Sequence, residues 1–289
     1  MSTRQATDLV AYVLLPALSL LMTAALSRRM LRRASGWKWL LSDDADLAFR
    51  GAHKHLDIPD SQAWKRRWKQ VELLDVRDLY LMLFGRAGSV LREIDYPASL
   101  ELARDRVLVG MHWGPAISIL KLLDRAGLKP AFPYRPVEPE LRRSRPFYYL
   151  FCRLATRYLV RTLGERAVLV GGAGKILQRM IGEPGSICVL MDAPPMEGRP
   201  AINKKVLGSE ARFNEGFPAM MAARGKEYVL YAMNLSDDGS IRKNLEMEGP
   251  FTAENPDEFL DRYAAFLDRH LSRDAPHWRI WRAGHQFWC

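Results

Sequence analysis

The stretch RVLVGMHWGPAISILKLL, from Arg106 to Leu123, decides the fold class of this chain. Its residues Val107 to Met111 form the short apolar run of a fully buried strand, and a helical pattern follows from Pro115. The same alternation continues downstream, with strands expected at 129–136, 186–192 and 226–235 and helices at 143–164, 173–185, 216–225 and 256–281. Strands that alternate with helices indicate βαβ units. We therefore predict an α/β fold with a mostly parallel central sheet flanked by helices.

The N-terminal segment is apolar and uncharged from Leu9 to Leu26, and the basic stretch RRMLRR (Arg28 to Arg33) follows it. The run is about as long as the shortest helix that crosses a bilayer, and basic residues after such a span mark its cytoplasmic side. We therefore expect a membrane-anchoring helix. Because Pro16 would kink it, a monotopic anchor lying in the membrane interface stays open, as does a helix buried in the protein core. The expected parts are an anchor with its basic flank at 1–34, a helical segment at 35–105 and an α/β body at 106–289.

The composition narrows the range of partners. The net charge of +10 suits nucleic acid, an anionic membrane surface or an acidic protein. Nucleic acid is not expected, because no nucleic-acid-binding motif is present and the N-terminus is apolar. The three cysteines, Cys152, Cys188 and Cys289, are far apart and fit no metal spacing, so we expect no metal.

His112 is the main candidate for chemistry. It follows a buried strand, at the carboxyl edge where open parallel sheets place their sites. Gly110 and Gly114 flank it, and we expect them to permit close approach of a ligand. Asp192 ends another predicted strand and should emerge at the same edge, where it supports His112 or positions the substrate; a cap on the turn before Pro194 is the alternative.

Five segments of the chain carry a resemblance to a known family. They are GMHWGP (Gly110–Pro115), YRPVEPEL (Tyr134–Leu141), GEPGSICVLMDAPP (Gly182–Pro195), FNEGFPAMMAARGKEYVLYAMN (Phe213–Asn234) and HWRIWRAGHQFW (His277–Trp288). In this order, and with the N-terminal segment, they resemble the bacterial lipid A late acyltransferases (the lauroyl/myristoyl type) of the lysophospholipid acyltransferase superfamily. The resemblance covers most of the chain and suggests a divergent member.

The resemblance implies an acyltransferase at the cytoplasmic face of the bacterial inner membrane. A fatty-type acyl group would pass from a thioester of acyl carrier protein or coenzyme A to a hydroxyl of a lipid, glycolipid or membrane-bound metabolite, without a cofactor. In the family a histidine is the general base, and an acid five positions later orients its ring. His112 fits this role, but Ile117 stands where the acid should be.

The remaining expectations concern substrate binding and the alternatives. Arg135 and one arginine among Arg153, Arg157 and Arg161 are expected to hold phosphate groups, since the guanidinium fork suits them. Arg161 fits best by its spacing from Asp192, although an arginine-rich helix could also be a solvated face. Glu215 is expected to bind substrate or to be a helix N-terminal acid. Backbone amides at the start of the Trp113–Leu123 helix, with an arginine, would stabilise the oxyanion. A catalytically impaired relative that only binds lipid or acyl carrier protein is the alternative function, and a hydrolase using Ser118 is a more distant one.

Overall fold

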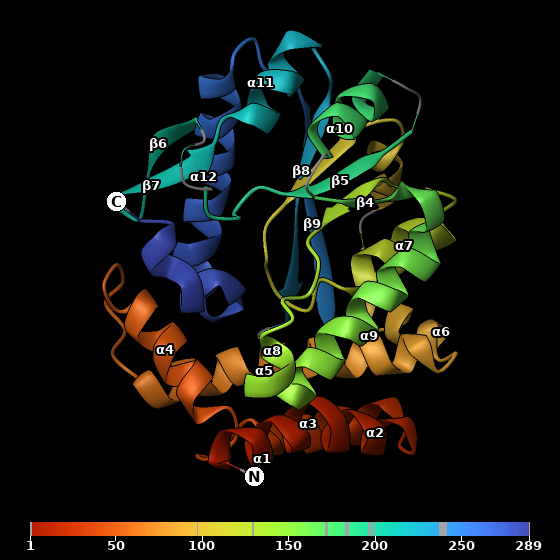
Figure 1. Cartoon of the computed structure of the whole chain (residues 1–289), viewed down its shortest axis with the longest axis vertical. Helices are drawn as coiled ribbons and strands as arrows, with labels where there is room; N and C mark the ends of the chain where they lie inside the picture. The colour runs from red at the N-terminus through yellow and green to blue at the C-terminus, as the bar shows by residue number, and fades with distance from the viewer. Residues whose placement is uncertain are drawn as a thin grey trace.

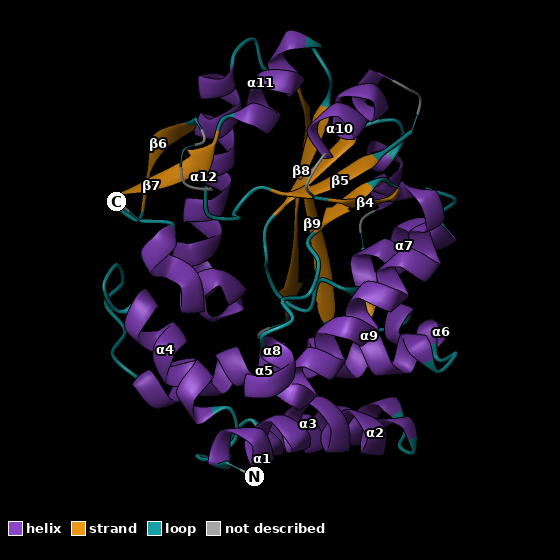
Figure 2. Ribbon diagram, viewed as in Figure 1, coloured by secondary structure: helices purple, strands orange, loops and turns teal. Residues whose placement is uncertain are grey.

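The computed structural model describes residues 2–96, 98–128, 130–170, 173–182, 185–195, 198, 200–236 and 242–288 (Figure 1). It has a central sheet in the upper part of the molecule and helical layers below it (Figure 2). Five strands form this sheet in the order β1 (Ile94–Asp95), β9 (Lys243–Phe251), β8 (Tyr228–Leu235), β2 (Val107–Gly110) and β5 (Ile187–Leu190).

The centre of the sheet is parallel, as the alternating pattern predicts. Strand β2 pairs in parallel with both β5 and β8, and Gly110 is opposite Leu190. Strand β9 runs antiparallel to β8 and was not predicted, nor was β1, which pairs with β9. The mixed α/β class and the mostly parallel core are thus confirmed.

Helices cover the sheet and extend the molecule below it. The body contributes α7 (Ser118–Arg125), α8 (Leu141–Ser144), α9 (Pro146–Leu163), α10 (Ala173–Gly182), α11 (Gly216–Ala223) and α12 (Pro256–Asp274). Two further sheets have two strands each: β3 (Phe132–Tyr134) with β4 (Ala167–Leu169), and the hairpin of β6 (Ala201–Val206) with β7 (Ser209–Asn214). The first adjoins the central sheet, since Ala131 forms a parallel bridge with Ile187 of β5. The closing helix ends at Asp274 rather than 281, and 3₁₀ turns at Ala275–His277 and Arg279–Gln286 follow it.

The segment before the sheet is helical, as expected. It contains α1 (Thr3–Leu9), a π-helical turn (Val10–Leu14), α2 (Leu15–Leu20), α3 (Ala24–Ala34), α4 (Ser42–Ala52), α5 (Ser61–Leu83) and α6 (Ala87–Leu91). Helix α5 lies at the centre of this layer and is buried along most of its second half. The division of the chain into three parts remains a prediction.

The structure does not support the expected anchor helix. Within the described part of the chain, no helix is both long and apolar enough to span a bilayer. The apolar run breaks after Leu20 because Thr23 caps the next helix, accepting a hydrogen bond from the amide of Leu26 at 3.3 Å. Pro16 has no N–H for the carbonyl of Tyr12, four residues earlier, and the Tyr80 hydroxyl donates to that carbonyl instead at 2.8 Å.

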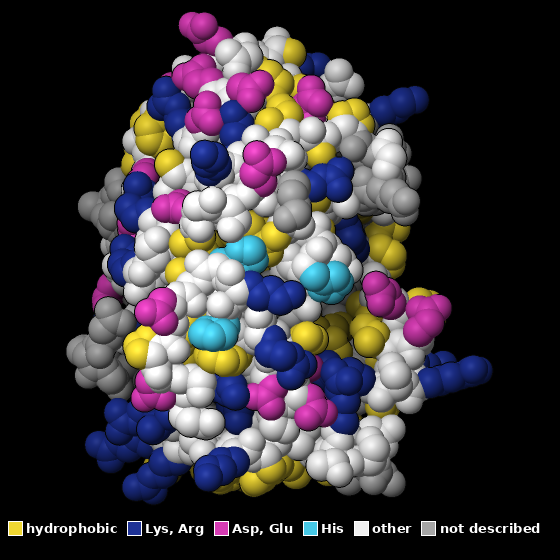
Figure 3. All heavy atoms as spheres, turned by 90° about the vertical axis from the view of Figure 1, so that its left-hand side faces the viewer, with side chains coloured by type: hydrophobic (Ala, Val, Ile, Leu, Met, Phe, Trp, Pro, Cys, Tyr) yellow, Lys and Arg dark blue, Asp and Glu magenta, His cyan; other side chains and the backbone are white. Residues whose placement is uncertain are grey.

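The two faces of the N-terminal run differ. Tyr12 and Leu15 are buried in the main core, whereas the side chain of Leu21 is 85% exposed. Figure 3 shows Lys and Arg side chains gathered with apolar ones along the lower edge of the molecule, where the N-terminal helices lie. This end of the protein therefore presents an apolar and basic surface.

Candidate functional site

The centre of the candidate site is a histidine–carboxylate pair. Nδ1 of His112 lies 2.8 Å from Oδ1 of Asp192, and the backbone N–H of His112 donates to Oδ2 of the same carboxylate at 2.7 Å. Asp192 is fully buried, while the His112 side chain is 38% exposed. Because a carboxylate only accepts hydrogen bonds, the ring donates through Nδ1 and Nε2 is left as the proton acceptor.

The parallel sheet brings this pair together across a gap of 80 residues in the chain. His112 and Asp192 each stand two residues beyond paired ends of β2 and β5, where Gly110 is opposite Leu190. The amide of Met191 donates to the carbonyl of Gly110 at 3.0 Å and continues the ladder to the edge. The predicted carboxylate support for His112 is thus present in the geometry, and position 117 is not needed for it.

The C-terminal segment completes the support of Asp192. The indole N–H of Trp278 donates to Oδ2 of Asp192 at 2.7 Å. The backbone around Trp278 is fixed in turn: Gly114 N–H donates to the carbonyl of His277, and Arg279 N–H to that of His112, both at 2.9 Å. Asp192 therefore accepts three hydrogen bonds, two from His112 and one from Trp278. The backbone bonds of His277 and Arg279 fix the positions of both donor residues.

Two expectations about the turn after β2 are wrong. A Cβ on Gly110 would lie 2.4 Å from the ring of Tyr231, and one on Gly114 would lie 1.9 Å from the carbonyl oxygen of Met233. The glycines thus make room for the protein itself rather than for a ligand. Gly114 also has a positive φ of 62°, which favours glycine.

The expected oxyanion site of backbone amides is also absent from this turn. The N–H of residue 113 donates to Met111, that of 116 to Gly114, and that of Ile117 to Oδ1 of Asp75 at 3.1 Å. The amides of 112 and 114 are engaged as described above, and residue 115 is proline. The helix itself begins only at Ser118, so the amides of residues 112–117 are not available to an oxyanion.

His112 opens into a cavity of about 1000 Å³. One part of its wall is apolar and comes mainly from β3, α7 and α9, with Ile119, Leu120, Phe132, Phe151 and Leu159 among its residues. Ile117 also lines it. The volume and the mixture of apolar wall and a few polar groups are typical of a small-molecule or lipid site.

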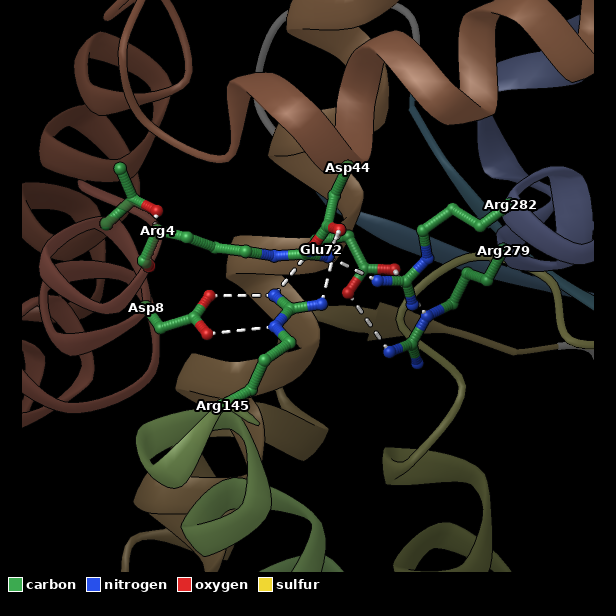
Figure 4. Close-up of polar contacts among 8 residues, drawn as sticks. Arg4, Asp8, Asp44, Glu72, Arg145, Arg279 and Arg282 are labelled. Carbon is green, nitrogen blue, oxygen red and sulfur yellow. Dashed lines mark hydrogen bonds and ion pairs between the residues drawn. The ribbon is translucent and has the colours of Figure 1, made fainter. Parts of the chain in front are cut away.

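A second part of the wall is a network of arginines and carboxylates (Figure 4). Arg145 holds both carboxylates of Asp8 and Asp44, with its closest contact to each at 2.7 Å. Arg279 binds Glu72 at 2.9 Å and Asp75 at 2.5 Å. The network joins the N-terminal helices, α5, the start of α9 and the C-terminal segment around one end of the cavity.

The electrostatics of this network are balanced. Burial alone would raise the pKa of Glu72, but the charges of Arg279 and Arg282 outweigh it and hold that pKa below its usual value. The pKa of Asp44 is lowered in the same way by Arg282 and Arg145 against the effect of burial. The four carboxylates of Asp8, Asp44, Glu72 and Asp75 are thus matched by the four guanidinium groups of Arg4, Arg145, Arg279 and Arg282.

The other predicted site residues fall into two groups. Arg135 lines the cavity with an exposed side chain and has no ion pair among the described residues. Arg161 is exposed on α9 and Glu215 precedes α11, and neither lines this cavity, so the structure does not bring them to His112. Ser118 is fully buried and its hydroxyl donates to the carbonyl of Pro115, which removes it as a nucleophile.

Sequence reasoning missed Trp278 and the arginines 145, 279 and 282. The segment HWRIWR, from His277 to Arg282, is unusually dense in tryptophan and arginine, and this was the available indication.

Among the described residues no cluster of three or more His, Cys, Asp or Glu side chains is suited to a metal ion. No family model matches this chain, and none of the curated proteins matches its sequence.

Proposed function

We propose that this protein is an acyltransferase that transfers a fatty-type acyl group from a thioester to a hydroxyl, with His112 as the general base. The observation that supports it most is the pair of His112 and Asp192, whose ring nitrogen Nε2 is free to take a proton beside a cavity of about 1000 Å³. The carboxylate stabilises the imidazolium that forms when the ring accepts this proton. The donor would be acyl carrier protein or coenzyme A carrying the acyl group, and the acceptor a lipid, glycolipid or membrane-bound metabolite.

The proposed reaction runs in two steps. Nε2 of His112 takes the proton of the acceptor hydroxyl as its oxygen attacks the thioester carbonyl carbon, and the carbonyl oxygen becomes an oxyanion. The oxyanion then collapses, the carbon–sulfur bond breaks, and the leaving thiolate takes the proton back from the imidazolium. Arg135, the arginine of the cavity wall without an ion pair among the described residues, is our candidate for stabilising the oxyanion or a phosphate on the substrate. The apolar wall would hold the acyl chain.

The test is an acyl transfer assay with purified protein, acyl thioesters of several chain lengths and a membrane lipid extract, followed by mass spectrometry. Wild type should consume thioester and form an acylated lipid. The variant His112→Ala should lose transfer, whereas His285→Ala, which removes an exposed histidine outside the cavity, should keep it. If the wild type binds the acyl donor but acylates nothing in the extract, the alternative of a catalytically impaired binding protein is favoured.

We also propose that the protein acts at a membrane surface, with the N-terminal helices lying in the interface rather than crossing it. Four leucines of this region, at 14, 18, 21 and 26, have side chains that are 45% to 85% exposed, and Trp37 and Trp39 stack on each other nearby at 5.6 Å. Exposed leucine, tryptophan and basic residues on one surface suit the headgroup region of an anionic bilayer.

Sedimentation with lipid vesicles tests this placement. Leu21→Glu with Leu26→Glu should weaken binding to vesicles that contain phosphatidylglycerol, because charges would enter the apolar layer. The control is Ile176→Glu on α10, which lies at the opposite end of the molecule (Figure 1). Equal binding of the double variant and the wild type would contradict in-plane docking.

A further inference from the structure

A groove on the outer side of α9 is lined by basic and apolar residues. Its volume is about 1180 Å³, and four arginines line it, at 142, 153, 157 and 161, with no acidic residue. No ion pair is formed by any of these four within the described part of the chain, although Arg153 lies over the ring of Tyr149. On the other side of the same helix start, Arg145 is buried between two carboxylates.

The spacing of the arginines on α9 makes this surface unusual. Residues 153, 157 and 161 are four apart, so their side chains follow one stripe along the helix. Like charges at this spacing destabilise a helix by roughly 0.2–0.5 kcal/mol per pair. None of the three forms an ion pair within the described part of the chain, and a partner of opposite charge would offset the repulsion between them.

The groove also has an apolar floor. Leu150, Val160 and Leu169 line it and their side chains are 40% to 50% exposed. Apolar contacts surrounded by positive charge are typical of a surface that docks an acidic protein, in which the charges steer the partner and the apolar contacts hold it.

The groove adjoins the cavity of His112. Pro136, Val137 and Thr156 line both, so a partner seated on the outer side of α9 lies directly beside the cavity that contains His112. Arg161, which the sequence assigned to substrate binding, stands in this groove instead of in the cavity.

We propose that this groove is the docking surface for the acidic carrier protein that delivers the acyl thioester. This inference rests on the proposed function, because the adjoining cavity must accept the acyl group. The carrier's acidic surface faces the arginines of α8 and α9, and its thioester arm passes over the shared wall at Val137 toward His112. An anionic membrane is the other partner class that carries negative charge, and the experiment separates the two.

The experiment measures the affinity of the full-length protein for acyl carrier protein by isothermal titration calorimetry. The triple variant Arg153→Glu, Arg157→Glu and Arg161→Glu should weaken binding by at least about tenfold, and wild-type binding should fall as salt is raised. The matched control reverses three exposed arginines elsewhere, Arg50→Glu, Arg212→Glu and Arg224→Glu, and should bind like the wild type. His112→Ala should also bind like the wild type, so docking is measured without turnover.

Three results would overturn the docking proposal. They are wild-type affinity of the groove variant, equal loss in the control variant, and loss of binding to phosphatidylglycerol vesicles with unchanged carrier affinity. Failure of acyl transfer in a protein that still binds the carrier through the groove would count against the proposed function and leave the docking surface in place. Thermal unfolding of all variants verifies that they are folded.

Discussion

The variant Asp192→Asn tests the role of the carboxylate most directly, because the structure dictates how the new amide must lie. Oδ2 of Asp192 accepts from two donors, the amide of His112 and the indole of Trp278, both at 2.7 Å. The oxygen of the asparagine must occupy this position, since an NH₂ group there would face two N–H groups. Its NH₂ group therefore faces Nδ1 of His112, where Oδ1 now lies at 2.8 Å.

This arrangement reverses the proton on the ring. An NH₂ group donates, so Nδ1 must accept and the proton of the neutral imidazole moves to Nε2. Nε2 then has no lone pair with which to take the proton of the acceptor hydroxyl. In hydrolases that use the same histidine–carboxylate arrangement, such a change costs about 10⁴-fold in turnover, or about 5 kcal/mol in activation free energy.

The assay is initial-rate acyl transfer at saturating donor, with Glu215→Gln as the matched acid-to-amide control outside the cavity. We expect a fall in kcat of about 10³- to 10⁴-fold for Asp192→Asn, near wild-type activity for the control, and little change in the donor KM of either. The melting temperature checks that the buried substitution is folded. A folded Asp192→Asn protein with activity within tenfold of the wild type would refute the tautomer argument.

Three other perturbations follow from the same contacts. Trp278→Phe keeps the ring packing but removes one hydrogen bond to the Asp192 carboxylate; we expect kcat to fall by about tenfold to a hundredfold, and an unchanged kcat in a folded variant would count against a positioning role. Arg145→Met leaves the buried carboxylate of Asp8 without its arginine and removes one of the three arginines that hold Asp44; it should lower the free energy of unfolding by about 3–5 kcal/mol, measured by urea denaturation against the exposed control Arg143→Met. Burial lowers the pKa of His270 below its usual 6.5, so the unfolded chain binds a proton that the fold excludes and stability should decline as pH falls below about 6.5. His270→Gln should lose that part of the decline, and identical pH profiles of unfolding would show that the residue makes no contribution.

The sequence predicts the centre of the fold well because its three parallel strands are buried on both faces. Runs such as Val107–Met111 are apolar without interruption, which is the pattern of such strands. Strand β9 (Lys243–Phe251) was missed because it lies toward the sheet edge and only some of its residues are buried, with charges at positions 243, 246 and 248. The β6–β7 hairpin likewise has few buried residues, so it carries little of the apolar pattern.

The site was predictable to the extent that topology determines it. Both His112 and Asp192 follow buried strands, and parallel strands present their carboxyl ends at one edge. Trp278 reaches the same carboxylate from a single extended residue between two 3₁₀ turns, and this segment has no periodic pattern from which its position could be predicted. The N-terminal run was misread for a related reason, because its length suits a membrane span. The burial of Tyr12 depends on α5, whose Tyr80 binds its carbonyl, and the turn after Leu20 is held by Arg86, which donates to the carbonyls of Leu20 and Met22.

The placement of the acid on a neighbouring strand explains the apolar residue at position 117. Because Asp192 orients His112 from β5, the side chain of Ile117 is available to line the cavity, and only its backbone N–H is held, by Asp75. Asp75 also binds Arg279, whose own N–H holds the carbonyl of His112. The turn that carries His112 and the network of arginines and carboxylates in the cavity wall are therefore fixed by the same few contacts with the C-terminal segment. A substitution in that segment should alter the geometry of His112 even where it touches neither the histidine nor Asp192, and this coupling is a stronger constraint on the chain end than packing alone.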